Sequence, residues 1–308
     1  MTTTTPAGAT APAAGRRRKA AAPKPAPTGP DRIPKPSQGW YRDKVTGEKY
    51  RRVTTILAQG STKGDVLALW AANLVAETAF ANLPRMVAAS RVPEQRQDMY
   101  NWLRRAPTRK KDERADIGSA VHRIIEAHVL GQPMPADLLT DPEMRPYLRH
   151  FLRFVEDWQV RFEASEMVVG NRTAGYAGTL DYLLRSPLIA AAFEIPANTV
   201  LMGDTKTGGE LDVKGVYPEA ALQMAAYRKA EVAWLRDGST VPMPATHTTG
   251  VVLHLRPEGY RLIPVVCDDQ VFAAFRVIQQ AADWVSGLSK SVIGEALALP
   301  TVPEKRAA

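Results

Sequence analysis

The spacing of hydrophobic residues predicts a helical first half and a second half in which strands and helices alternate. Helical spacing extends from about residue 63 to residue 105, and Pro84 and Pro93 divide this stretch into three predicted helices. Two more helices are predicted over residues 116–130, with Asp116 as the N-cap, and over residues 144–161. The period then changes to two, which predicts strands over residues 165–172, 178–185 and 199–205.

The remaining expected elements flank these segments. They are a β segment with a Thr46-Gly47 turn over residues 41–53, a helix over 217–236, strands over 250–256 and 260–266, and a helix over 268–286. The order predicts an α/β sheet domain preceded by an N-terminal helical elaboration.

The first 38 residues differ in composition from the rest of the chain. They hold 8 of the 24 prolines, no aromatic residue, and seven cations against one anion, so most of the net charge of +8 lies there. A segment with so little to bury is predicted to be disordered. It could act as a phosphate-binding arm or as a solubilising leader. We divide the chain into this tail, a β-turn and helical region over 39–115, a core over 116–290 and a C-terminal tail over 291–308.

Several functional classes are excluded or disfavoured by composition. Cys267 is the only cysteine, so one chain can form neither an internal disulfide nor a four-cysteine zinc or iron–sulfur site. The longest apolar stretch, residues 66–83, is interrupted by polar residues and indicates an amphipathic helix rather than a membrane span. The polar N-terminus does not resemble a secretory signal, and a cytoplasmic location is expected. Residues 104–114, with six cations and two anions, are interpreted as a solvated linker.

Two predicted strands carry the residues best suited to chemistry. Asp181 is an isolated carboxylate in an apolar run, and a period of two places Asp204 and Lys206 on one side of the next strand. Two carboxylates on neighbouring strands can bind a hard cation such as Mg²⁺ or Mn²⁺. A lysine beside the cation can orient or deprotonate an attacking water. In a simpler interpretation, Asp204 and Lys206 form a surface ion pair.

Two predicted helices carry further polar pairs. His122 and Glu126 share a face of the helix that starts near residue 116, where Gly118 permits close approach of another backbone. Gln223 and Tyr227 share a face of a later helix. A lone helical histidine is more often a packing residue than a ligand, and the second pair could be a polar helix edge.

The ordered set of these motifs resembles the RecB-like exonuclease branch of the PD-(D/E)XK nuclease superfamily. The set covers about residues 116–236 and consists of Gly118-x-x-x-His122, Gly178-Thr-Leu-Asp181, Asp204-Thr-Lys206-Thr-Gly208 and Gln223-x-x-x-Tyr227. The resemblance implies a restriction-endonuclease-like mixed central sheet flanked by helices. It also implies that metal is bound by His122, Asp181 and Asp204.

The same resemblance implies roles for the remaining residues. Lys206 would assist the attacking water, while Gln223 and Tyr227 would contact DNA or brace the site. Glu166 matches an acidic position found in some members. The chain departs from many members in lacking iron–sulfur cysteines, so no such cluster is expected, and in having Asp204 where glutamate is commoner.

The expected function is therefore a Mg²⁺- or Mn²⁺-dependent DNA nuclease of a bacterial cell or phage-infected host. Exonuclease action in recombination, repair or phage DNA processing is favoured by the family resemblance alone. Expected partners are DNA and a recombination or single-strand-annealing protein, with no membrane partner. The basic residues 104–114 and the tail would supply sequence-independent phosphate contacts. The alternatives are a structure-specific or restriction-type endonuclease with the same site and a catalytically silent DNA-binding accessory protein.

Overall fold

The computed structural model describes residues 28–61, 63–211 and 216–297. The tail predicted to be disordered lies mostly outside the described residues, but its last part is ordered and corrects the expected boundary at residue 38. Gly29–Arg32 forms the 3-10 helix η1, and strand β1 (Lys35–Ser37) pairs with β2. Ile33 packs against a buried cluster that includes Tyr41 and Trp234. These apolar contacts order the end of the segment that composition assigned to the tail.

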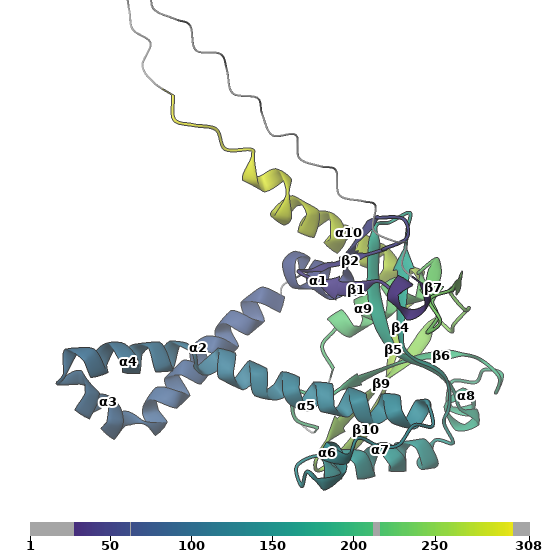
Figure 1. Ribbon diagram of the computed structural model, residues 1–308, viewed down its shortest axis with the longest axis horizontal. Coiled ribbons are helices and arrows are strands. Elements are labelled where there is room, and N and C mark those ends of the chain that lie inside the picture. Colours follow the sequence, from purple (N-terminus) through teal and green to yellow (C-terminus); the bar gives the residue numbers. More distant parts are fainter. Residues whose placement is uncertain (1–27, 62, 212–215, 298–308) are drawn as a thin grey trace, which may run out of the picture.

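A mixed, mostly antiparallel open sheet forms the centre of the molecule (Figure 1). The described residues contribute ten strands to it, β1 (Lys35–Ser37), β2 (Trp40–Arg42), β3 (Lys49–Arg52), β4 (Arg161–Asn171), β5 (Tyr176–Arg185), β6 (Leu201–Lys206), β7 (Val232–Trp234), β8 (Thr240–Pro242), β9 (Thr249–Arg256) and β10 (Gly259–Val266). Only the β3–β5 and β6–β9 pairs are parallel. The α/β class and the mixed sheet flanked by helices are confirmed.

Strand β5 is the branch point of the sheet. It pairs with β4 along most of its length, with β3 through Tyr176 and Ala177, and with β6 through residues 182–184. Between these two contacts, residues 178–181 pair with neither β3 nor β6. The sheet therefore opens next to Asp181.

Helices cover both faces of the sheet and bury two apolar clusters. On one face lie α1 (Val53–Gly60), α9 (Glu219–Arg228) and α10 (Asp269–Ser286), which share a cluster with β4, β5 and β6. On the other face lie α5 (Ala106–Val129), α6 (Ala136–Thr140), α7 (Arg145–Asp157) and α8 (Pro187–Ala192). Burial of these two clusters provides the main driving force for folding.

An arm of helices projects from this body (Figure 1). It consists of α2 (Lys63–Ala81), α3 (Leu83–Ser90), α4 (Pro93–Arg104) and the first half of α5, so the division at Pro84 and Pro93 is confirmed. Large apolar side chains are exposed on it, including Leu69 at 65% and Phe80 at 79%. Among the described residues, no single helix has the length and apolarity of a membrane span. One pair, Gly64–Ala81 and Leu83–Ser90, meets these criteria jointly but is bent by 80°.

The prediction that the charged segment is a linker is wrong, because residues 106–114 belong to α5. This helix starts at Ala106 and runs without interruption to Val129, so Asp116 lies inside it and is not an N-cap. Pro107 is tolerated in the first turn, where backbone N–H groups have no helical partner. Alanine, arginine, lysine and glutamate are good helix formers, which explains why the charged segment continues the helix.

The helix predicted over residues 217–236 is also shorter than expected. It ends at Arg228, and Val232–Trp234 forms β7, which pairs with β4 and with β8. The amide of Asn171 donates to the carbonyl of Lys229 at 2.8 Å and satisfies a group at the helix end. All three β7 residues are buried, so tertiary pairing overrides their helical spacing.

Gly203 in β6 provides a test of how closely the sheet packs near Asp204. A Cβ atom there would lie 2.0 Å from Cε2 of the buried Tyr182 ring. We expect Gly203→Ala to lower the free energy of unfolding by about 1–3 kcal/mol through overpacking. Gly208→Ala, where a Cβ would meet nothing within 4 Å, is the control and should change stability little. Urea unfolding measures both; equal stability of the two variants would contradict the packing argument.

Candidate metal centre

Three carboxylates lie side by side across the adjacent strands β4, β5 and β6. The β4–β5 register pairs the residues on either side of Glu166 with those on either side of Asp181. Extending the β5–β6 register by one residue places Asp181 opposite Asp204. Residues opposite one another on neighbouring strands point to the same face. Glu166, Asp181 and Asp204 therefore form an acidic row at the point where the sheet opens.

Helix α5 adds His122 to this row. Its apolar face, including Val121 and Ile125, is buried against the sheet, which fixes the rotation of the helix. The His122 Nδ1 atom lies 2.9 Å from Oε1 of Glu166, and Nε2 lies 3.9 Å from Oδ2 of Asp181. Ligand atoms of these three residues all lie within 4.8 Å of one another.

Glu166 has an unusual backbone conformation for a strand residue. Its φ angle is +50°, in the left-handed region that non-glycine residues seldom adopt. Such a conformation persists only where surrounding contacts stabilise it, and it is often found at functional sites. Here the pairing of β4 with β5 continues on both sides of Glu166, and its carboxylate contacts His122.

Asp204 is the most deeply buried of the three acids, with its side chain 5% exposed. Its Oδ1 accepts a hydrogen bond from Nε2 of Gln223 at 3.2 Å. Its Oδ2 lies 2.5 Å from Nζ of Lys206, so the ammonium offsets the charge of this buried carboxylate. A buried carboxylate needs a positive partner, which Lys206 provides here and which a bound cation could also provide.

The charges of the site alter the acidity of its members. Burial and the negative charge of Asp204 raise the pKa of Asp181 to about 7. Burial acts to lower the pKa of His122, but its hydrogen bond to Glu166 and the nearby carboxylates outweigh this and raise the pKa to about 9. Burial likewise opposes the charge on Lys206, whose pKa is nevertheless raised by Asp204 and Asp181. Without a metal, Lys206 is an ammonium at neutral pH and cannot serve as a base.

The donor set fits a divalent cation. Carboxylate oxygens from Glu166, Asp181 and Asp204 suit Mg²⁺ and Mn²⁺, and the imidazole of His122 is a ligand more typical of transition metals. A backbone N–H of Thr205 donates to Oδ2 of Asp181 at 2.7 Å and fixes the orientation of that carboxylate. These residues could hold a cation while leaving coordination positions open to other oxygen ligands.

Of the other predicted residues, Gln223 and Tyr227 contact the site or the strand that carries it, whereas Glu126 does not reach the cluster. Gln223 contacts Asp204 directly, while Tyr227 is 4% exposed and packs against β5. A Cβ on Gly178 would lie 2.3 Å from the Tyr227 ring, so Tyr227 supports the strand that carries Asp181. Glu126 is not brought to the cluster, because its Oε1 pairs with Nη2 of Arg236 at 2.8 Å.

Sequence reasoning missed two residues of β9 that support the loop after Lys206. Nε2 of the buried His254 lies 2.8 Å from the Gly208 carbonyl, and Nη1 of Arg256 donates to the Thr207 carbonyl at 2.6 Å. Polar residues at alternate positions of an otherwise apolar strand were the available signal. Their partners depend on the parallel pairing of β6 with β9, which single-sequence patterns do not specify.

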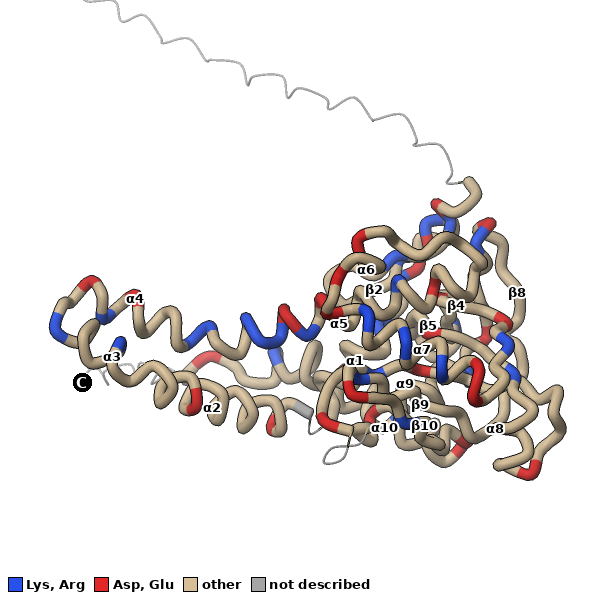
Figure 2. The backbone as a smooth tube through the Cα atoms, turned by 90° about the horizontal axis from the view of Figure 1, so that it is seen from below, with Lys and Arg blue, Asp and Glu red and all other residues tan. Residues whose placement is uncertain are grey.

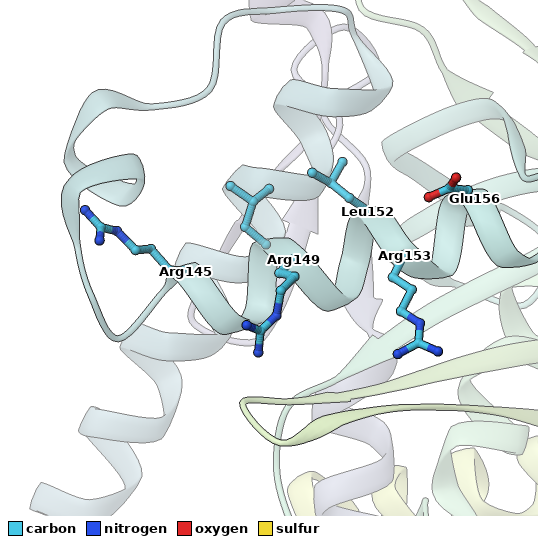
Figure 3. A pocket seen from close by; sticks show the side chains of 6 residues that line it. Arg145, Arg149, Leu152, Arg153 and Glu156 are labelled. Atoms are coloured by element: carbon cyan, nitrogen blue, oxygen red, sulfur yellow. The ribbon is translucent and has the colours of Figure 1, made fainter.

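A second surface feature lies apart from this cluster. A shallow hollow on α7 is lined by Arg145, Leu148, Arg149, Leu152, Arg153 and Glu156 (Figure 3). None of these residues belongs to the acidic row, and of them only Leu148 also packs against the apolar cluster shared with α5. We do not include it in the candidate site.

Comparison of the sequence with models of known protein families and with curated proteins gives no match. The interpretation of the site therefore depends on its geometry and on the motif resemblance.

The raised pKa values predict how pH affects stability. Asp181 and His122 bind protons more tightly in the folded than in the unfolded chain, so their contribution to stability falls as pH rises to about 9. We expect the melting temperature of the metal-free protein to fall between pH 6.5 and 9, and Mn²⁺ to raise it most at the alkaline end, because the cation competes with protons.

Thermal unfolding in EDTA or Mn²⁺ across this pH range measures the effect. Asp181→Asn preserves an acceptor for Thr205 N–H but removes one charge, so it should lose most of the Mn²⁺-dependent increase. Equal increases at pH 6.5 and pH 9, or a full increase in Asp181→Asn, would contradict metal binding by this cluster.

Proposed function

We propose that the protein is a divalent-metal-dependent deoxyribonuclease that hydrolyses phosphodiester bonds. The observation that carries the proposal is the position of Asp181 beside Asp204 on adjacent strands, with Lys206 next to them, at an opening of the sheet. The motif resemblance to RecB-like members of the PD-(D/E)XK superfamily supports DNA as the substrate and a restriction-endonuclease-like fold.

The residues have distinct roles in this proposal. His122, Glu166 and Asp181, whose ligand atoms lie together, would hold the cation with Asp204 from the adjacent strand, and Gln223 donates to Asp204. A bound Mg²⁺ or Mn²⁺ stabilises the negative charge that develops on the phosphate and leaving oxygen. Lys206, whose side chain is 38% exposed, can reach solvent while it contacts Asp204. Its ammonium orients the attacking water and stabilises charge on the phosphate.

Exonuclease action is proposed over endonuclease action because the motif order is that of the RecB-like branch. A recombination or single-strand-annealing protein is the proposed partner class on the same ground. The endonuclease with this site remains the second candidate, and a catalytically silent DNA-binding protein is the third. A binding protein has no need for the Asp181, Asp204 and Lys206 trio.

Substrate topology tests the choice between these candidates. With Mg²⁺, an exonuclease should degrade linear DNA to short products and leave covalently closed circles intact. The measurement is gel analysis of both substrates over time, with EDTA as the control. Rapid linearisation of closed circles would favour the endonuclease, and binding without cleavage of either substrate would favour the silent protein.

Two substitutions separate cation binding from chemistry. Lys206→Ala should reduce single-turnover cleavage about 10²-fold or more while retaining Mn²⁺ affinity, since the carboxylates are unchanged. Asp204→Asn should lose both, because a cation ligand loses its charge. Calorimetric titration measures the Mn²⁺ affinity of each variant, and the single-turnover assay measures its cleavage rate.

The matched control is Lys229→Ala, which removes a lysine that pairs with Asp269 on the surface. It should cleave DNA at the wild-type rate. Wild-type cleavage by Lys206→Ala would show that Asp204 and Lys206 form only an ion pair, and the nuclease proposal would fail.

A further inference from the structure

We propose that the first half of α5 is a phosphate-contacting surface that positions the DNA backbone relative to the metal cluster, with Lys111 and Arg114 as its main contacts. The inference rests on the proposed function, since it takes DNA as the ligand. It follows from the finding that the basic segment is not a linker but part of the helix that carries His122.

The continuity of α5 fixes the distance between the basic residues and the cluster. Lys111 precedes His122 by eleven residues in one uninterrupted helix, which corresponds to about 16 Å along its axis. Along duplex DNA this is roughly five base-pair steps of 3.4 Å. A backbone phosphate at about that distance from the cluster would therefore lie near Lys111.

The helical phase places the cations on the side of the cluster. At about 100° per residue, Lys111 lies within roughly 20° of His122 around the helix axis. Gly118, which lies between them in sequence, is within about 40° of His122. A Cβ on Gly118 would be 3.6 Å from Oγ1 of Thr207, so this face of α5 is directed at the loop after Lys206. Arg114 lies roughly 80° to the side.

Neither acidic residue of the segment lies as close to the His122 face as Lys111 does. By the same spacing, Asp112 and Glu113 lie about 80° and 180° from His122, and Glu113 pairs with Lys110 at 2.8 Å. Figure 2 shows Lys and Arg clustered on α5 where the helix leaves the body. Lys111 is therefore the charged residue of this segment that shares the His122 face, with Arg114 and Asp112 about 80° to either side.

Lys111 and Arg114 remain available to an external anion. Both are exposed, and among the described residues neither pairs with a carboxylate. Arg114 lies over the ring of Trp70 at 5.9 Å, a contact that orients its guanidinium without neutralising it. By contrast, Arg109 donates to the Trp102 carbonyl at 2.7 Å and lies over that ring, and Arg153 on α7 pairs with Asp157 at 3.2 Å.

Salt dependence of DNA binding tests the proposal. Lys111→Gln and Arg114→Gln remove charge while retaining good helix formers. Affinity for a 30-base-pair duplex is measured in EDTA from low to moderate salt. Each variant should reduce the negative slope of log affinity against log salt by about 0.9, and the double variant by about twice that.

Arg145→Gln is the matched control. It removes the same charge from the exposed side of α7, so a general loss of positive charge would affect it equally (Figure 3). The proposal expects its salt slope and its cleavage rate to equal those of the wild type. A slope change in Arg145→Gln as large as in Lys111→Gln, or an unchanged slope in the Lys111 and Arg114 double variant, would overturn it.

An assay with a small substrate distinguishes failure of this inference from failure of the proposed function. Wild-type protein with Mn²⁺ is assayed on bis(p-nitrophenyl) phosphate, which is too short to extend from the cluster to Lys111. If the wild type hydrolyses this ester and DNA while the double variant keeps the wild-type salt slope, only the phosphate surface is rejected. If the wild type hydrolyses neither, the nuclease function is rejected, and a reduced slope would still support DNA contact along α5.

Discussion

The site depends on the placement of three carboxylates in adjacent positions on three strands. Like charges so close together in a partly buried setting repel one another, and burial adds to the cost. The fold offsets this with two cations, His122 and Lys206, with hydrogen bonds from Gln223 and the Thr205 backbone, and with an opening of the sheet beside Asp181. The same repulsion would be relieved by the proposed divalent cation, so stability without metal and affinity for metal would be opposed within one set of residues.

The strands that carry the site could be predicted because their side chains alternate. A period of two is sufficient to place Asp204 and Lys206 on one face, and consecutive strands are usually neighbours, which places Asp181 beside them. The contribution of Glu166 was much harder to assign. Its orientation depends on a left-handed backbone conformation in β4 and on the position of His122, neither of which follows from local spacing.

The errors in the sequence prediction have two physical causes. The charged start of α5 lacks apolar periodicity, so helix propensity and packing against α2 decide its structure instead of amphipathicity. A short element such as β7 depends on a partner distant in sequence, since it pairs with β4, more than sixty residues earlier. Three-residue strands have too few side chains to produce a pattern, and their existence is a property of the assembled sheet.

The division of the site between a sheet and a helix has a consequence for binding. The carboxylates belong to strands held on both sides by hydrogen bonds, whereas His122 belongs to a helix whose first half extends into the arm. An anion bound along α5 and a cation bound at the cluster both act on that helix, and any dependence of one affinity on the other must be reciprocal. If His122 binds a cation as proposed, residues 106–114 are joined to that ligand by one unbroken helix, which gives a physical route for such coupling.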